Sequence, residues 1–341
     1  MTPRRMPGIL GAVLCCACRP PPVPHDTAEP VGGEPHAAET GTGGETGTEG
    51  ETGQDTALTG RIVFHRYSSY DSWDSVLLML ELSDHSLTEI STDWDIDHAM
   101  NAHFSPDGSQ LVFMGDQRGG ERDWDVFLWT IGSSAPPRNL TEGWGTRDED
   151  PKFTPDGTIV CKSGYDLIEL DTTGSVVATL TSDGTAIEQS MPFATHDGAQ
   201  VIYARGAGKT SDLHLIGRDG ADDTIVQCDE GVQEYYPIVR DAETYLFTRW
   251  VSATNAHDQV YLGNWDGTPA LALPLNDASS NDSDAFPYGD DAVLVSSTRS
   301  GGAGGYDLYV ADITSGTMVS LSAWNPGINT SREELGAAYT P

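Results

Sequence analysis

The sequence predicts an all-β protein: a six-bladed β-propeller that follows a signal segment and a disordered linker. Three observations predict this fold. A unit of strand, turn, strand, loop and strand recurs along the chain; the copies are spaced at the length of a four-stranded blade; and the two ends of the repeat region complete one blade between them. Residues 59–341, which contain the copies, are long enough to form one domain with a large core.

The clearest copy of the unit spans residues 101–131, NAHFSPDGSQLVFMGDQRGGERDWDVFLWTI. Its SPDG segment at 105–108 has the composition of a tight turn and separates two short apolar runs. A polar, Gly-rich loop then leads to a third apolar run, which Asp125 opens. The turn recurs in altered form in four later segments: DPKFTPDGTIVC, MPFATHDGAQVIY, YPIVRDAETYLF and AFPYGDDAVLV.

An aspartate at the start of the third strand marks the register of every unit. Six such aspartates are spaced by 51, 41, 46, 46 and 49 residues, which is typical of a propeller blade rather than of a helical repeat. They are Asp74, Asp125, Asp166, Asp212, Asp258 and Asp307. One aspartate per blade at a single register predicts a turn hydrogen bond rather than a functional group.

The two ends of the repeat region are complementary. Residues 336–341, GAAYTP, match the start of a unit as far as its turn, and residues 60–64, GRIVF, match the strand that follows the turn. Residues 74–82 supply the third strand. We therefore expect blade 1 to be closed by strands from both termini, so that no blade keeps an unpaired edge. Only residues 332–335 have a helical character.

These units resemble the WD-like β-propeller repeat of the TolB-type family, which occurs in periplasmic TolB and in many bacterial envelope proteins. The resemblance covers residues 60–341. Residues 105–108 fit the family's turn fully and residues 154–157 nearly so, whereas His196 replaces the proline in the fourth blade and two later turns have lost most of the motif. The resemblance implies a six-bladed propeller in the cell envelope.

Residues 1–18 have the order of an export signal: two arginines, a short apolar segment at 7–14, and then CCAC. The apolar segment is too short to span a bilayer. A cysteine after a small residue resembles a bacterial lipoprotein signal, which implies that Cys18 is the lipidated residue, with Cys16 and Cys15 as alternatives. We expect an exported protein that is anchored by lipid to the outer membrane and faces the periplasm or the cell surface. A plain secretory signal, giving a periplasmic or secreted protein, is the other interpretation.

Residues 19–58 are rich in Pro, Gly, Thr and Glu and show no apolar periodicity, so they are predicted to be a disordered acidic tether. The net charge of the chain is -34. Most of it belongs to residues 59–341, which contain 44 acidic and 15 basic residues. Such a surface repels nucleic acid and anionic lipid, so contact with a membrane is expected only through the N-terminal lipid. The charge suits divalent cations, basic protein patches or simply solubility, and solubility is the simplest explanation.

Candidate ligand-binding residues lie in and just before the innermost strands. We expect acidic side chains there, with Asp150, Asp284 and Glu333 among them, to gather around one mouth of the central channel, where several carboxylates would suit calcium. An acidic residue at this place in the repeat family also serves to fix the turn between blades. His103 and Lys152 are the polar members of a set of equivalent inner-strand positions that also contains Phe193, Ile238, Phe286 and Ala338. The channel-mouth candidates are His103, Lys152, Asp148, Glu149, Glu188, Glu234, Asp282 and Glu334.

No catalytic motif is evident, and the GAGKT segment at 206–210 is predicted to be a hairpin loop because a strand follows it where a phosphate-binding loop needs a helix. Cys161 and Cys228 either pair in an oxidising compartment or remain thiols. The predicted function is that of a monomeric, non-enzymatic envelope lipoprotein that binds a partner protein of the envelope and needs no cofactor. The alternatives are a carbohydrate-binding or carbohydrate-active propeller and a calcium-stabilised structural propeller.

Overall fold

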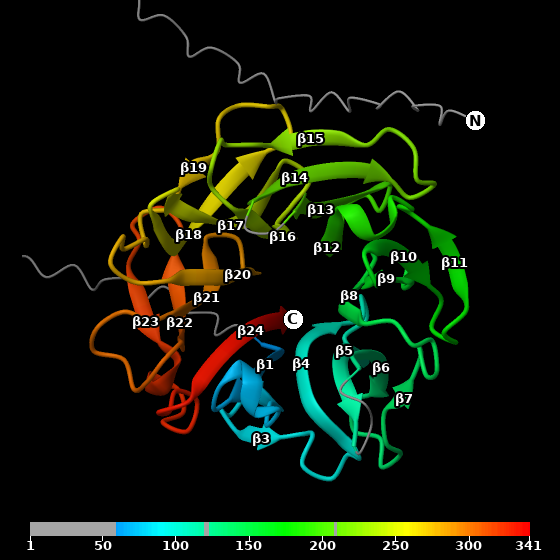
Figure 1. Cartoon of the computed structure of the whole chain (residues 1–341). Coiled ribbons are helices and arrows are strands. Elements are labelled where there is room, and N and C mark those ends of the chain that lie inside the picture. The colour runs from blue at the N-terminus through cyan, green and yellow to red at the C-terminus, as the bar shows by residue number, and fades with distance from the viewer. Residues whose placement is uncertain (1–58, 119–122, 208–209) are drawn as a thin grey trace, which may run out of the picture. The chain divides into compact units, whose positions relative to one another are not determined.

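The computed structural model describes residues 59–118, 123–207 and 210–341. These residues form six four-stranded antiparallel sheets, arranged as blades around a ring (Figure 1). The predicted fold class is therefore confirmed. The predicted signal segment, the tether and the candidate lipid acceptor Cys18 lie outside the described residues. Within the described ranges, no helix is long and apolar enough to cross a membrane.

Each blade has its innermost strand first in the following order. Blade 1 contains β24 (Glu333–Thr340), β1 (Arg61–Tyr67), β2 (Val76–Glu81) and β3 (Leu87–Glu89). Blade 2 contains β4 (Ile96–Phe104), β5 (Gln110–Gln117), β6 (Asp125–Thr130) and β7 (Arg138–Asn139). Blade 3 contains β8 (Asp148–Phe153), β9 (Ile159–Ser163), β10 (Asp166–Leu170) and β11 (Val176–Thr179). Blade 4 contains β12 (Glu188–Ala194), β13 (Gln200–Ala207), β14 (Thr210–Gly217) and β15 (Thr224–Gln227). Blade 5 contains β16 (Glu234–Val239), β17 (Thr244–Ser252), β18 (Asn255–Asn264) and β19 (Leu271–Ala272). Blade 6 contains β20 (Asp282–Tyr288), β21 (Ala292–Ser297), β22 (Asp307–Asp312) and β23 (Met318–Ser320). Three short 3-10 helices lie in connections: η1 (Tyr70–Ser72), η2 (Gly184–Ala186) and η3 (Leu321–Ala323).

Blade 1 closes the ring as predicted. Strand β24 pairs antiparallel with β1, from Thr340 opposite Arg61 to Glu333 opposite Tyr67. The expected helical character of residues 332–335 is wrong, because β24 begins at Glu333 and takes up the hydrogen bonds that β1 offers. Long-range strand pairing overrides a weak local helical preference.

The apolar core is divided among the junctions between neighbouring blades. Between blades 1 and 2, for example, Val63, Phe113 and Trp94 belong to one buried cluster. Trp94 is only 6% exposed although it lies in a connection, whereas Trp144, in another connection, is 37% exposed. Because every blade packs against two neighbours, each blade depends on the closure of the whole ring.

The aspartates that open the third strands have structural roles. Asp74 accepts a hydrogen bond from the Ser68 amide at 2.9 Å, and Asp307 accepts one from the Ala303 amide at 2.6 Å. These two contacts confirm the predicted turn hydrogen bond. Asp258 differs, since it accepts hydrogen bonds from the phenol groups of two tyrosines.

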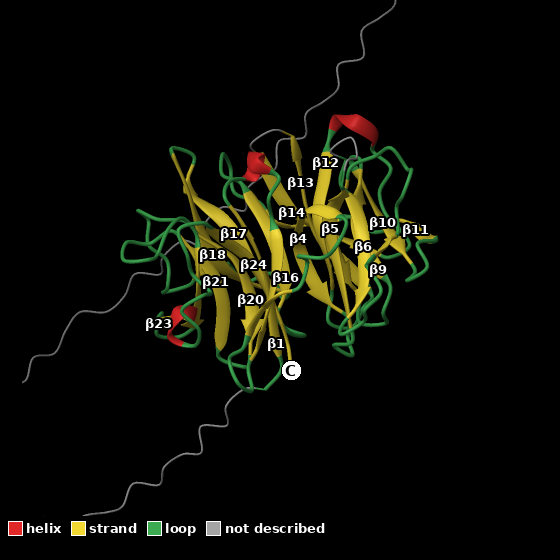
Figure 2. Ribbon diagram, turned by 90° about the horizontal axis from the view of Figure 1, so that it is seen from below, coloured by secondary structure: helices red, strands yellow, loops and turns green. Residues whose placement is uncertain are grey.

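The ring has two distinct faces. The inner strands begin at what we call the upper face, and they end at the lower face, where the SPDG-type turns lie. Because Arg61 is paired with Thr340 at the end of β24, the first described residue, Thr59, also lies at the lower face. Figure 2 shows the C-terminus at this lower end of the ring. The prediction that a strand, and not a helix, follows the GAGKT segment is confirmed, since β14 begins at Thr210 and pairs with β13, with Ala207 opposite Thr210 at the upper face.

Candidate functional site

Every inner strand bends at one residue close to the upper face. Its φ angle lies between 48° and 61°, and the pairing with the second strand shifts register around it. The six bulge residues are Asn101, Asp150, Met191, Tyr236, Asp284 and Gly336. Five of them are not glycine, although left-handed backbone costs an ordinary residue about 1–2 kcal/mol. Such bulges redirect side chains and often lie at functional sites.

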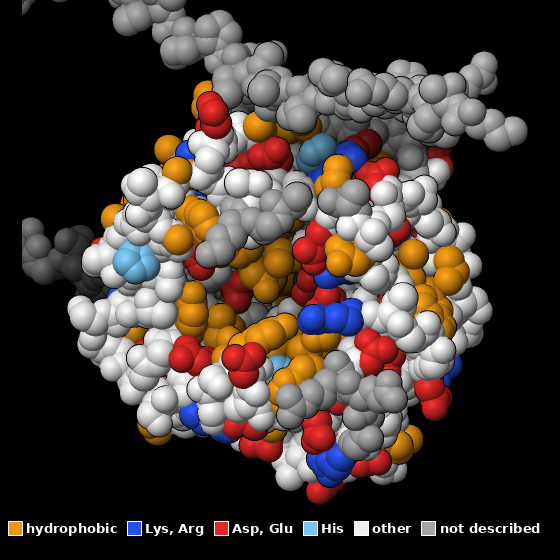
Figure 3. Space-filling model, in the orientation of Figure 1, with side chains coloured by type: hydrophobic (Ala, Val, Ile, Leu, Met, Phe, Trp, Pro, Cys, Tyr) orange, Lys and Arg blue, Asp and Glu red, His pale blue; other side chains and the backbone are white. Residues whose placement is uncertain are grey.

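The bulge residues surround a cavity at the upper end of the central channel. The cavity has a volume of about 350 Å³, and Asn101, Asp150, Met191, Tyr236 and Asp284 all line it. Figure 3 looks onto this face and shows a hollow at the centre of the ring, with acidic and basic side chains at its edge and apolar side chains inside it. We call this space the upper chamber.

Gly336 is the glycine among the bulge residues, and His65 explains why. A Cβ atom added at Gly336 would lie 2.6 Å from Cε1 of His65 and 2.7 Å from its Nδ1. His65 is 4% exposed and accepts a hydrogen bond at Nδ1 from the Asn101 amide at 3.4 Å, so the ring has little freedom to move away. In blade 1, the His65 side chain of the second strand therefore occupies the space that a side chain at Gly336 would need.

We expect Gly336→Ala to destabilise the protein by about 1–3 kcal/mol more than Gly145→Ala, because only the first creates an overpacked contact. Gly145 is the matched control: its φ is 70°, close to the 61° of Gly336, and nothing lies within 4 Å of a Cβ added there. Urea denaturation of the full-length variants gives the two free energies. Equal losses would show that His65 moves aside and that the contact does not constrain the bulge.

Two carboxylates lie at the floor of the upper chamber, and the ammonium group of Lys152 lies just below them in the narrow section of the channel. Asp150 is 8% exposed and accepts a hydrogen bond at Oδ1 from Asn101 Nδ2 at 2.8 Å. Burial raises the pKa of Asp150, and burial together with the nearby Asp258 raises the pKa of Asp284 to about 6. Burial lowers the pKa of Lys152, and the negative charges of Asp150 and Asp284 oppose this effect without cancelling it.

The edge of the chamber carries a compact charge network. Lys162 Nζ lies 2.6 Å from Glu149 Oε2 and 2.6 Å from Glu188 Oε1, while Arg147 Nη2 lies 2.6 Å from Glu149 Oε1. The network joins blade 3 to blade 4, since Glu188 begins β12. Two basic groups balance two acidic groups, so this part of the edge has no net charge.

Below the chamber the channel narrows around His103. The Phe153 amide donates a hydrogen bond to His103 Nδ1 at 3.1 Å, and Phe193 and Phe286 lie edge-on to the imidazole. Burial and the charge of Lys152 lower the pKa of His103 to about 3, so the ring is neutral with its proton on Nε2. A small cavity of about 40 Å³ lies above this ring, and one of about 260 Å³ opens on the lower side.

The structure separates the eight channel-mouth candidates into three groups. Glu149 and Glu188 line the upper chamber, and His103 and Lys152 line the narrow section. The other four side chains are fully buried and do not line the upper chamber; they are Asp148, Glu234, Asp282 and Glu334.

These four buried acids are bound within the blades and their connections. Arg299 donates to Asp282 at 2.8 Å, and Thr146 donates to Asp148 at 3.1 Å. Gln227 donates to Glu234 at 3.3 Å, and Arg66 of β1, whose side chain is 12% exposed, binds Glu334. The contacts of these four acids fit the role of fixing the turn between blades, which the resemblance to the repeat family implies. Ligand binding by any of the eight candidates stays a prediction.

Asp150 and Asp284, two of the acidic residues expected around the channel mouth, do line the chamber, whereas Tyr236 and the other aromatic and methionine side chains of its wall were not among the candidates. Asp150, Tyr236 and Asp284 each precede a predicted inner-strand position by two residues, so strand alternation alone would have placed them toward the channel as well. The predicted inner-strand positions do line the channel below the chamber. No group of three or more His, Cys, Asp or Glu side chains in the described ranges is arranged to hold a metal ion.

Cys161 and Cys228 do not form a disulfide in the structure. Cys161 is buried in the core between blades 2 and 3, and burial raises the pKa of its thiol. The Cys228 side chain forms a hydrogen bond with the Asp212 carboxylate. In the structure, Cys161 and Cys228 therefore remain thiols, which is the second of the two predicted alternatives.

Comparison with solved structures shows what the fold resembles. No protein-family model matches the chain, and no curated protein sequence matches it. TolB from Acinetobacter baumannii superposes with a TM-score of 0.63 at 15% identity, over 83% of this chain and 67% of that chain. Hydrazine synthase from Kuenenia stuttgartiensis gives a TM-score of 0.64 at 14% identity, over 83% of this chain and 47% of that chain. A puromycin-hydrolyzing peptidase from Mycobacterium tuberculosis gives 0.52 at 15% identity, over 78% and 44%. At these identities the likeness shows the fold alone, and one fold can serve several functions.

Proposed function

We propose that this chain, whose six-bladed propeller has the TolB-like fold, is a non-enzymatic lipoprotein of the bacterial envelope that binds a partner protein through its upper face. The binding surface would consist of the rim of the upper chamber and the connections around it. The mechanism is presentation of a rigid, preformed surface, without covalent chemistry.

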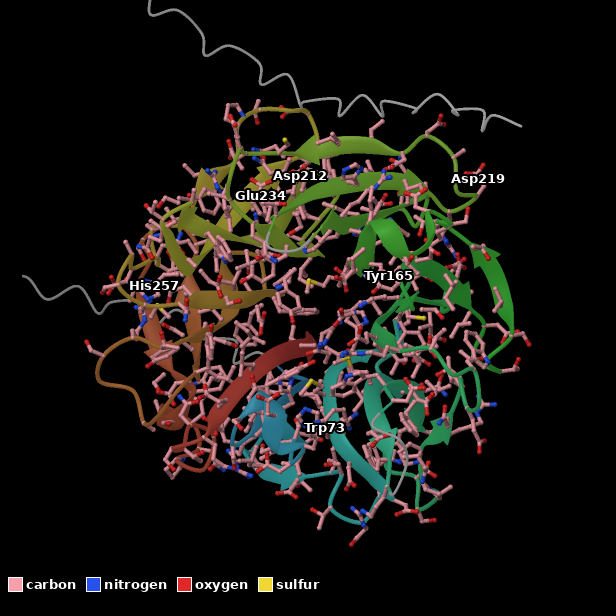
Figure 4. All side chains as sticks on the ribbon, in the orientation of Figure 1. Trp73, Tyr165, Asp212, Asp219, Glu234 and His257 are labelled. Atoms are coloured by element: carbon pink, nitrogen blue, oxygen red, sulfur yellow. The ribbon has the colours of Figure 1, made fainter. Side chains whose placement is uncertain are left out.

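The observation that carries this proposal is a group of exposed aromatic side chains on the upper face. Tyr70, Tyr165 and Trp144 are 49%, 45% and 37% exposed, and all three lie in upper-face connections. Figure 4 shows Tyr165 on blade 3, on the face that carries the chamber. Tyrosine and tryptophan are enriched in protein interfaces and supply much of their binding energy.

The position of the first described residue also supports the upper face as the binding surface. Thr59 lies at the lower face, so the chain enters the propeller on the side away from the chamber. If Cys18 carries the lipid, the upper face stays available to a partner while the protein is anchored. The carbohydrate and calcium alternatives remain predictions.

The experiment is photo-crosslinking in intact envelopes, with a photoreactive amino acid replacing Tyr165 in the full-length chain. We expect one partner protein to be captured in near-equal amount from this position. Replacement of Val177 is the matched control, since Val177 is 56% exposed on the outer strand β11 of the same blade. A second variant, Tyr70→Ser, combined with the probe at Tyr165, should reduce capture roughly tenfold or more if Tyr70 is an interface anchor.

Equal capture from Tyr165 and Val177, or no capture from either, would contradict the proposal. A chain carrying Cys15→Ser, Cys16→Ser and Cys18→Ser serves as the anchoring control. If this variant no longer associates with the membrane and no longer captures the partner, the two proteins bind each other at the membrane surface. Glycan arrays on the same protein test the carbohydrate alternative.

A further inference from the structure

We propose that the upper chamber binds the primary ammonium group of an organic amine, with Asp150 and Asp284 as counter-ions and an apolar, aromatic wall around the amine's stem. The amine is either a free small molecule or a lysine side chain of the partner protein. The inference depends on the proposed function only for the second source.

The charges inside the chamber leave an unbalanced carboxylate. At the edge, Lys162 and Arg147 already neutralise the two glutamates of the network described above. Below the floor, Lys152 interacts electrostatically with both Asp150 and Asp284, and Lys162, which is already paired with the glutamates, also acts on Asp150. One negative charge of this pair therefore has no balancing cation among the described residues that line the chamber.

Lys152 does not form a close pair with either aspartate. No nitrogen–oxygen distance within 4.0 Å joins it to a carboxylate in the described part of the chain. Its Nζ donates to the Pro151 carbonyl at 3.4 Å. The two aspartates thus keep acceptor sites that Lys152 does not occupy.

Asp150 has a specific free acceptor. The carboxylate is more than nine-tenths buried, and only its Oδ1 receives a hydrogen bond, from Asn101. Its Oδ2 receives none from the described residues, and it belongs to a side chain that lines the chamber. An ammonium group in the chamber would supply three donors, one of which can bind this oxygen, together with the missing charge.

The walls of the chamber fit an alkyl stem rather than a bare ion. Four tyrosines and three methionines line it: Tyr67, Tyr70, Tyr235, Tyr236, Met100, Met114 and Met191. Aromatic faces attract cations, and thioethers pack against flexible alkyl chains. The described residues contain no cluster of three or more potential metal ligands. The volume of about 350 Å³ is at the small end of the range for organic ligands.

The test is isothermal titration calorimetry of the full-length chain with pentane-1,5-diamine, at about 0.15 M salt to suppress diffuse binding to the acidic surface. We expect one saturable site per chain. Asp150→Asn and Asp284→Asn should each weaken it roughly ten- to hundredfold, because each removes a charge-assisted hydrogen bond. Asparagine suits these positions, since it tolerates left-handed backbone. Pentane-1,5-diol, which is uncharged, should not bind.

The matched control is Asp219→Asn, which changes the net charge equally at an exposed turn on the periphery of blade 4 (Figure 4). It should bind the diamine like the wild type. Many weak sites that all three variants reduce equally would overturn the inference, because such binding reflects only the overall negative charge.

A further arm separates the two sources of the amine. In one outcome, the diamine fails to bind while photo-crosslinking still captures the partner. If this capture is then lost both in the Asp150→Asn variant and after acetylation of the partner's lysines, the amine is a lysine side chain of the partner. If neither the diamine nor partner capture depends on Asp150, the inference fails. Specific diamine binding in a chain that captures no partner would instead reject the proposed function and leave this inference standing.

Discussion

Arg66→Met is expected to destabilise the protein by about 3–5 kcal/mol, because it leaves a fully buried carboxylate without its counter-ion. Arg66 Nε lies 2.7 Å from Oε1 of Glu334, whose side chain is fully buried. The guanidinium also donates to the carbonyls of Gly327 and Ile328 at 2.6 and 2.7 Å. These contacts join β1 to the segment that leads into β24, so they hold the ring closed.

Urea denaturation of the full-length variants measures this loss. Arg61→Met is the matched control on the same strand, since Arg61 and Glu81 also lie 2.7 Å apart but are 37% and 39% exposed. An exposed pair of this kind contributes about 1 kcal/mol or less. Equal losses in the two variants would show that closure does not depend on the buried pair.

The double variant Arg66→Met/Glu334→Gln isolates the buried charge. Thr330 donates to both oxygens of Glu334, from its hydroxyl to Oε1 at 2.6 Å and from its amide to Oε2 at 3.0 Å, and the single oxygen of a neutral glutamine can keep one of these two hydrogen bonds. We therefore expect the double variant to recover part of the stability that Arg66→Met loses. Additive losses would mean that Arg66 acts through packing and through the carbonyl contacts alone.

The stability of the protein is expected to fall as the pH rises from about 5 to about 9, chiefly because of Glu234. Burial, together with the nearby Asp229, raises the pKa of Glu234 to about 8 from an ordinary value of 4.5. Its side chain is fully buried, and its Oε2 has no hydrogen-bond partner among the described residues. Arg249 Nε is 3.9 Å from Oε1, which is too far for a hydrogen bond.

The sign follows from proton binding. Between the ordinary pKa and the raised one, the folded protein holds a proton that the unfolded chain releases, so stability is fully present below about 4.5 and is lost as the pH rises through about 8. Within this window each pH unit removes up to about 1.4 kcal/mol. Glu234→Gln should remove most of this slope and be more stable than the wild type at high pH.

Denaturation at several pH values measures the slope. Glu230→Gln is the control, because Glu230 is an exposed glutamate in the same connection and should keep the wild-type profile. A smaller slope at low pH should persist in Glu234→Gln, since burial also raises the pKa of Asp148 and of Asp284 to about 6. If Glu234→Gln instead lowers stability at every pH, Glu234 is ionised and paired with Arg249.

Much of the fold follows from local chemistry in the sequence. The turn at residues 105–108 forms as its composition predicts: the Gly108 amide donates to the Ser105 carbonyl at 2.8 Å, and Gly108 has a φ of 66°. The match between residues 336–341 and the first described strand also predicted how the ring closes. Both signals are readable because they rest on residue types that a turn or a strand requires.

The chamber was only partly predictable. Strand alternation predicts that Asp150 faces the channel, because it precedes Lys152 by two residues. No feature of the local sequence predicts left-handed backbone at Met191 or Tyr236. The acids that seemed to surround the channel are divided by the structure, and Asp282 and Glu334 are bound to arginines instead of lining the chamber. A one-dimensional pattern places a carboxylate in a strand without showing which side of a bulge it occupies.

The amino-acid sequence alone determined the number of blades, the positions of their turns and the closure of blade 1, because each depends on a repeated local pattern. The tertiary structure decided which side chains form the upper chamber. Six inner strands converge on one axis and bend at equivalent residues, and this convergence brings Asp150 and Asp284, 134 positions apart in the sequence, into the wall of a single cavity. Such a site depends on the closed ring, since no single blade contains it.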